Sequence, residues 1–335
     1  MSESVASGLS CARGRWLGFG ALLALAIGVI LLSLLSGSTG LGVQRALAAL
    51  AGRGDAAARM IVLELRLPRL IAAFGVGGLL AIAGVLLQAL FRNPLADPYI
   101  VGVSGGAAVG AVLALATSAA WWMTQWAALA GALVALIALY LLGRGGGTAR
   151  LLLAGVALAS ASGAAVSVLE TLADPAQARG MMFWLAGDLS WTTRPLLSAG
   201  AALLALLGAL LLARPLNVLA AGELRARSVG LQVDAWRWIV YGGAAFATSV
   251  AVVSAGTVGF IGLVTPHGVR LLFGTSDHRI VAPASAVLGG TLLAAADLAS
   301  RTVASPRQLP VGAITALLGA PVFIALLRSG ARSRA

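Results

Sequence analysis

Residues 66–106 read RLPRLIAAFGVGGLLAIAGVLLQALFRNPLADPYIVGVSGG, and this stretch decides the fold. No residue between Leu70 and Phe91 is charged, and Arg66 and Arg69 stand just before this run. A helix of about 22 residues at 1.5 Å per residue is about 33 Å long, close to the roughly 30 Å hydrocarbon core of a bilayer. A turn with two prolines, RNPLADP, follows the run. The stretch therefore predicts one membrane-spanning helix with charged groups at both ends.

The composition extends this prediction to the whole chain. Of its 335 residues, 60% are hydrophobic and 10% are charged, whereas soluble domains are about 25% charged. We therefore expect an all-α, polytopic membrane protein in the lipid bilayer. Its net charge of +12 is expected to set orientation in the membrane, and we expect no nucleic-acid partner.

The residue types also exclude several chemistries. Every basic residue is arginine, so the chain lacks the lysine of a nucleotide-binding P-loop and of a Schiff base. If ATP drives its activity, another chain must hydrolyse the ATP. One cysteine, Cys11, and two histidines, His267 and His278, predict no intrachain disulfide and no metal site.

Ten apolar runs of spanning length follow one another along the chain. They are 16–35, 70–91, 99–118, 121–142, 151–169, 195–213, 238–255, 257–273, 280–296 and 309–327. Arginine placement favours both termini inside, and the remaining outward arginines suggest an acidic partner outside. We divide the chain into a cytoplasmic leader at 1–15, one ten-helix membrane domain at 16–328 and a cytoplasmic tail at 329–335. Within that domain, 214–237 is too polar to span, and we expect a cytoplasmic segment of two short helices divided at Gly230.

Two motifs raise alternatives from other functional classes. Residues 102–106 match G-x-S-x-G, which marks a serine nucleophile in some hydrolases, and His267 is the only partner for Ser104 in an apolar run. A secondary transporter driven by an ion gradient would need buried acids in mid-span, whereas Asp297 lies near a span end. Arg301 follows Asp297 by four residues, so the two side chains either pair along one helix or present Arg301 for docking.

Several stretches together resemble the permease subunits of the ABC importers for iron-siderophores, haem and cobalamin, the type II importers. In the family's order, between about residues 60 and 328, they are RLPR, QALFRNPLADP, GVSGGA, RPLNVLAAGELRARSVGL, GTVGFIGLVTPHGVR, DHR and QLPVGAITALLGAPVF. The resemblance implies ten transmembrane helices and a homodimer around a central path in a bacterial inner membrane. It also implies two cytoplasmic ATPase subunits, which use the ATP, and a periplasmic binding protein. The chain itself is then not an enzyme and holds no covalently bound cofactor.

The resemblance assigns residues to three tasks. Docking of the binding protein falls to Arg66, Arg69 and Arg301, the cytoplasmic gate to Asn93, Leu95 and Thr148, and coupling to the ATPase to Leu216, Ala221, Gly222, Glu223, Arg225, Arg227 and Gly230. The chain departs from the family at Gln308, where an acidic residue is frequent. A salt bridge made by that acid is therefore in doubt.

The cargo is predicted from one cluster, MMFW, which comprises Met181, Met182, Phe183 and Trp184. Aromatic residues near a span end anchor a helix at the membrane interface, or they line the mouth of a path for a flat apolar ligand. On the second interpretation we expect haem, with a ferric siderophore or cobalamin as the alternatives.

Overall fold

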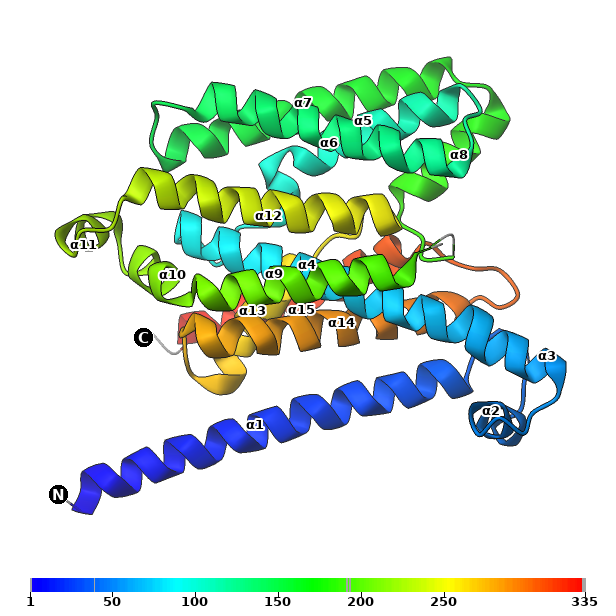
Figure 1. The fold of residues 1–335 in the computed structure, drawn as a ribbon, viewed down its shortest axis with the longest axis horizontal. Helices are drawn as coiled ribbons and strands as arrows, with labels where there is room; N and C mark the ends of the chain where they lie inside the picture. The colour runs from blue at the N-terminus through cyan, green and yellow to red at the C-terminus, as the bar shows by residue number, and fades with distance from the viewer. Residues whose placement is uncertain (1, 39, 191, 193, 333–335) are drawn as a thin grey trace.

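The computed structural model describes residues 2–38, 40–190, 192 and 194–332. The predicted all-α class is confirmed, because these residues form helices joined by turns, with no strand among them (Figure 1). The long helices are α1 (Ser2–Leu35), α4 (Leu67–Phe91), α5 (Val103–Ala116), α6 (Trp121–Gly143), α7 (Thr148–Leu172), α9 (Pro195–Leu211), α12 (Val233–Ala255), α13 (Ile261–Phe273), α14 (His278–Thr302) and α15 (Val311–Arg332). The short ones are α2 (Val43–Leu50), α3 (Ala56–Arg59), the π-helix Met60–Arg66, the 3-10 helix Pro98–Val101, α8 (Pro175–Leu185), α10 (Ala213–Ala220) and α11 (Glu223–Ser228).

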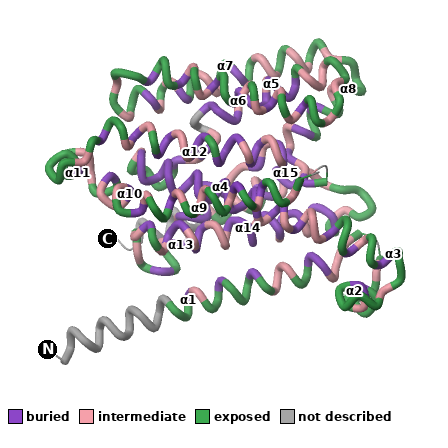
Figure 2. Tube along the Cα trace, viewed as in Figure 1, coloured by how far each residue is buried: buried purple, intermediate pink, exposed green. Residues whose placement is uncertain are grey.

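Helix α4, which forms from the opening stretch, is the centre of the bundle. Every residue from Gly75 to Leu90 is buried, and helices α9, α12, α13 and α14 pack around it. Figure 2 shows this buried centre, with more exposed helices such as α1 and α7 at its periphery. A helix that is apolar on all sides is expected in such a position.

Small residues set the distance between α4 and its neighbours. Gly77 faces the backbone of Gly289 on α14, and Gly84 faces the backbone of Gly262 on α13, so closely that a Cβ atom at either position would overlap a carbonyl group. Helices in a membrane associate through close packing of this kind rather than through the hydrophobic effect. The glycines of the opening stretch are therefore contacts between helices.

Each of the ten predicted apolar runs contains one long helix, but not all of these helices have the expected length. Among the described residues, six helices are long and apolar enough to cross a membrane, or seven if the bent pair α9 and α10 counts as one span. Helices α5 and α13 are shorter than their runs, because backbone breaks precede them. Gly102 and Phe260, at their N-caps, both adopt left-handed backbone conformations, with φ of 80° and 69°.

The two ends of the bundle differ. One end, called here the coupling end, carries α10 and α11, and the start of α1 and the end of α15 lie on the same side (Figure 1). The other end, called here the arginine end, carries α2, α3 and α8 (Figure 1), together with Arg66 at the start of α4 and Arg301 at the end of α14.

The polar segment 214–237 forms two short helices, as predicted, but the predicted position of the break was wrong. The chain breaks at Ala221 and Gly222, between α10 and α11, and Gly222 has a φ of 121°. Gly230, with a φ of 80°, lies in the turn that follows α11. The helix that contains α4 begins at Ala56, before the predicted apolar run 70–91.

Candidate functional site

Three charged side chains meet at the arginine end. Asp297 on α14 accepts a hydrogen bond from Arg69 Nε at 2.6 Å through Oδ1. Its other oxygen, Oδ2, lies 3.0 Å from Arg301 Nε. The Asp297 side chain is 2% exposed, and those of Arg69 and Arg301 are 12% and 10% exposed. One buried carboxylate therefore holds two guanidinium groups and ties α14 to α4.

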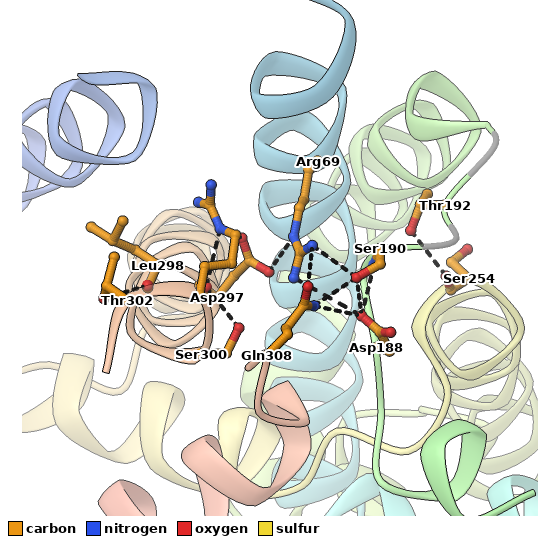
Figure 3. A network of polar contacts seen from close by, with 11 residues as sticks. Arg69, Asp188, Ser190, Thr192, Ser254, Asp297, Leu298, Ser300, Thr302 and Gln308 are labelled. Carbon is orange, nitrogen blue, oxygen red and sulfur yellow. Dashed lines mark hydrogen bonds and ion pairs between the residues drawn. The ribbon is translucent and has the colours of Figure 1, made fainter. Parts of the chain in front are cut away.

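A set of polar groups continues this contact away from α14 (Figure 3). Arg69 Nη1 donates to Ser190 Oγ at 2.8 Å and to Gln308 Oε1 at 3.4 Å. Gln308 Nε2 donates to Ser190 Oγ at 2.6 Å and to Asp188 Oδ1 at 3.2 Å. We call Arg69, Asp188, Ser190, Asp297, Arg301 and Gln308 the outer network.

Gln308 thus takes part in hydrogen bonds at the position where the resemblance suggested a missing salt bridge. The carboxylates near Arg69 belong to other residues. Asp297 is in direct contact with it, and Asp188 Oδ1 lies 3.9 Å from Arg69 Nη2. Of the two alternatives for Asp297 and Arg301, the structure shows the pairing along one helix.

Arg66 lies at the same end but bonds differently. Arg66 is 5% exposed, and its Nη1 donates to the carbonyl oxygen of Leu34 at 2.7 Å. Because Leu34 is near the end of α1, this bond fastens α1 to the start of α4. The docking role of Arg66, Arg69 and Arg301 stays a prediction, and each of the three also makes contacts within the chain.

A cavity of about 660 Å³ opens beside the outer network. Phe183 and Trp184 of α8 line it, as do Trp121 at the start of α6 and the network residues Asp188, Ser190 and Gln308. The predicted MMFW cluster is therefore divided. Met181 is fully buried and Met182 is 57% exposed, and neither of them lines this cavity.

The predicted gate residues lie toward the coupling end. Asn93 Oδ1 accepts a hydrogen bond from the backbone N–H of Leu95 at 2.9 Å, which shapes the turn after α4. Asn93 and Leu95 line a small pocket of about 70 Å³ together with Leu151 of α7. Thr148 is the first residue of α7, one turn before Leu151. Asn93 and Leu95 thus lie beside the first turns of α7, the helix that Thr148 begins, and the gate role of the three residues stays a prediction.

Most of the predicted coupling residues lie exposed at the coupling end. Glu223 binds Arg227 at 3.3 Å and Arg237 at 2.9 Å, which fixes α11 against α12. Arg225 and Gly230 are exposed and Ala221 is exposed beside the break at Gly222, whereas Leu216 is fully buried. Leu224, which the sequence did not single out, is 87% exposed on α11.

Asn217 joins the coupling segment to α14. Its Nδ2 donates to Asp277 Oδ1 at 2.8 Å, and its Oδ1 accepts from the backbone N–H of His278 at 3.0 Å and lies 2.6 Å from His278 Nδ1. The hydrogen bond from Asn217, followed by that from the Arg279 backbone N–H, lowers the pKa of Asp277. The sequence did not single out Asn217, because its partners lie about 60 positions away.

Among the described residues, no site is assembled for the alternative functions. Ser104 Oγ donates to the backbone carbonyl of Tyr99 at 3.4 Å, and His267 Nε2 has no hydrogen-bond partner among the described residues. No group of three metal-ligating side chains occurs in the part of the chain that the structure describes. The acid Asp297, which an ion-coupled mechanism would use, is held by two arginines.

Helical spans packed around a central helix that is buried from Gly75 to Leu90 define the class of a multi-pass membrane protein. Residues 23–329 match the FecCD transport family. The chain belongs to this family and is a permease of an ABC importer.

Named relatives and solved structures agree with this assignment. The chain is 44% identical over 282 residues to the cobalamin import system permease protein BtuC of Halobacterium salinarum, which covers 81% of this chain and 74% of that one. It is 40% identical over 284 residues to the vitamin B12 import system permease protein BtuC of Escherichia coli, with coverages of 82% and 85%. A metal-chelate type ABC transporter in an inward-facing conformation superposes with a TM-score of 0.83 at 28% identity, covering 93% of this chain and 99% of that one.

Proposed function

We propose that the chain is the permease subunit of a cobalamin importer. Two copies would enclose a central path, with ten spans in each copy, and two cytoplasmic ATPase subunits would supply the energy. A periplasmic binding protein would deliver the cargo at the arginine end. The observation that carries the cargo assignment is the similarity to two proteins named as cobalamin or vitamin B12 permeases, at 44% and 40% identity.

Haem, the cargo expected from the MMFW cluster, has weaker support. That expectation treated four side chains as one apolar surface, but Met181 is buried in the bundle and Met182 lies outside the cavity. The surface that remains combines two aromatic rings of α8 with a polar wall of Asp188, Ser190 and Gln308. A polar wall suits a ligand that carries hydrogen-bonding groups at its edge.

The two ends of the bundle support docking of a binding protein at one end and of an ATPase subunit at the other. Arg66, Arg69 and Arg301 gather at one end, where acidic groups of a binding protein would be attracted; such charges give specificity and association rate more than affinity. At the other end, α11 presents the exposed Leu224 and Arg225. An exposed apolar side chain beside charges suits a groove on an ATPase subunit.

The test is uptake into liposomes that contain the chain with its ATPase subunit, supplied with the binding protein. We expect ATP-dependent accumulation of cyanocobalamin and none of haem or a ferric siderophore. Accumulation of haem or a siderophore instead of cobalamin would refute the cargo. Uptake by the isolated chain on an ion gradient would refute the importer assignment and support a secondary transporter.

A further inference from the structure

A buried amide, that of Gln88, lies near the end of α4 where three segments meet. Gln88 is 4% exposed, and its Oε1 accepts a hydrogen bond from Arg270 Nη1 of α13 at 2.6 Å. Its Nε2 lies 3.3 Å from the carbonyl oxygens of both Gly262 and Leu263, and 3.5 Å from that of Ala96. One side chain therefore joins α4 to α13 and to the turn after α4.

A proline in α13 creates the need for this amide. Pro266 lies inside α13, and a proline has no N–H group to donate to the carbonyl four residues before it, which is that of Gly262. Gly262 is buried, and a freed carbonyl inside a membrane bundle is costly unless a neighbouring group bonds to it. Gln88 supplies that hydrogen bond from α4.

The turn after α4 meets α13 at the same point. A Cβ atom added to Gly262 would lie 2.7 Å from both Cγ and Cδ of Pro98 in this turn. Ala96, whose carbonyl faces Gln88, is 6% exposed, whereas residues 92–95 of the turn are half-buried or exposed. The buried part of the turn is thus the part that the amide holds.

The amide has fewer hydrogens than it has acceptors. A guanidinium can only donate, so Arg270 fixes the amide with Oε1 toward itself and the NH₂ group toward the carbonyls. This group has two hydrogens, but three carbonyl oxygens lie within hydrogen-bond distance. When the turn moves away, both hydrogens can stay bonded to α13. No buried hydrogen of the amide then lacks an acceptor.

We propose that Gln88 is a positioning residue for transport, whose amide holds the turn after α4 against α13 in one state of the gate and bonds to α13 alone in the other. The proposal rests on the proposed function, and on the predicted gate role of Asn93 and Leu95 in this turn. Because the hydrogen passes to a carbonyl of α13, α4 and α13 stay joined in both states. A movement that starts at the coupling end then displaces the turn without opening the centre of the bundle.

The first experiment removes the two hydrogens of the amide. Gln88→Glu cannot donate to the carbonyls but still accepts from Arg270, so the guanidinium keeps a partner. The matched control is Thr265→Val, because Thr265 is also buried and its Oγ1 donates to the carbonyl of Ile261 in its own helix at 2.8 Å. Cargo accumulation and ATP hydrolysis are measured for the complete transporter in liposomes, and their ratio is compared.

We expect Gln88→Glu to lower the cargo accumulated per ATP hydrolysed about fivefold, within the range that mutations between coupled sites produce, and Thr265→Val to leave this ratio as in the wild type. A merely structural role would lower both rates together and leave the ratio unchanged, and that result would overturn the proposal. The cargo used is the one that the wild type accumulates in the uptake test above. A cargo other than cyanocobalamin therefore refutes the proposed function while this test still decides the role of Gln88.

The second experiment leaves Gln88 in place and decides the matter if Gln88→Glu fails to assemble. Arg270→Met removes the donor that orients the amide, whereas Arg270→Lys keeps a charged donor at this position. We expect the ratio to fall more than about twofold in Arg270→Met and to stay closer to that of the wild type in Arg270→Lys. Equal ratios in these two variants would overturn the proposal.

Discussion

Asp297→Asn tests whether the outer network stabilises the bundle through its charge. Asp297 is 2% exposed and is the shared partner of Arg69 at 2.6 Å and Arg301 at 3.0 Å. The amide has nearly the same shape, but its neutral oxygen can accept from one guanidinium only, and its NH₂ group points hydrogens at the other. Arg301 then loses its carboxylate partner, and Arg69 keeps only the more distant Asp188, whose Oδ1 is 3.9 Å from Arg69 Nη2.

The expected size of the effect follows from this burial. Removing one partner of a buried ion pair costs about 3–5 kcal/mol, which corresponds to a fall in Tm on the order of 5–10 °C for a chain of this size. The assay is thermal unfolding of the purified chain in detergent, followed by circular dichroism. Because buried pairs are poorly screened, the loss should persist at high salt.

Asp55→Asn is the matched control. Asp55 also pairs with one arginine, Arg45, but their side chains are 50% and 59% exposed, and exposed pairs contribute little to stability. Asparagine at position 55 can still cap α3, as Asp55 does by accepting from the Ala58 N–H. Equal Tm values for Asp297→Asn and Asp55→Asn would refute the claim that the outer network holds α14 to α4.

Further predictions concern the coupling end and the central helix. Asn217→Asp places a carboxylate against Asp277 and should lower ATP-driven uptake. The double variant Asn217→Asp with Asp277→Asn restores the hydrogen bonds and should recover uptake. If uptake does not recover, the link between α10 and α14 is contradicted. Folding lowers the pKa of Asp277, so the wild type should be more stable than Asp277→Asn above the ordinary Asp pKa of 3.8. This difference in stability should be lost as the pH falls below 3.8. A difference that is constant with pH in thermal unfolding would refute the assignment. Gly84→Leu forces α4 away from Gly262 and should cost about 1–3 kcal/mol in detergent unfolding. An unchanged Tm would refute the close packing.

Much of the fold follows from local sequence. An uncharged run of spanning length must pair its backbone groups internally, so it becomes a helix in lipid, and each predicted run contains one. The breaks before α5 and α13 were not predicted, because they depend on single backbone conformations at Gly102 and Phe260. Hydrophobicity does not change at those residues. The early start of the helix at Ala56 was missed because the charged residues Arg59, Glu64 and Arg66 interrupt the apolar run there.

The site was predictable only where its contacts are local or match a known motif. Asp297 and Arg301 are four residues apart, and their pairing was one of the two alternatives that the sequence left open. Arg69 lies 228 positions from Asp297 and 121 from Ser190, so nothing in the neighbouring sequence joins them. Gln308 was noticed as a departure from the family, but its bonds to Ser190 and Asp188 depend on the packing of distant segments. Long-range contacts of this kind require the folded chain.

The central proposal is that this permease transports cobalamin with energy supplied by an ATPase partner. The most direct measurement is cyanocobalamin accumulation in liposomes that hold the chain with an active ATPase subunit or with a hydrolysis-deficient one, both supplied with loaded binding protein and ATP. We predict accumulation above the external concentration with the active subunit only. Equal accumulation with both subunits, or none with either while haem accumulates, would contradict the account.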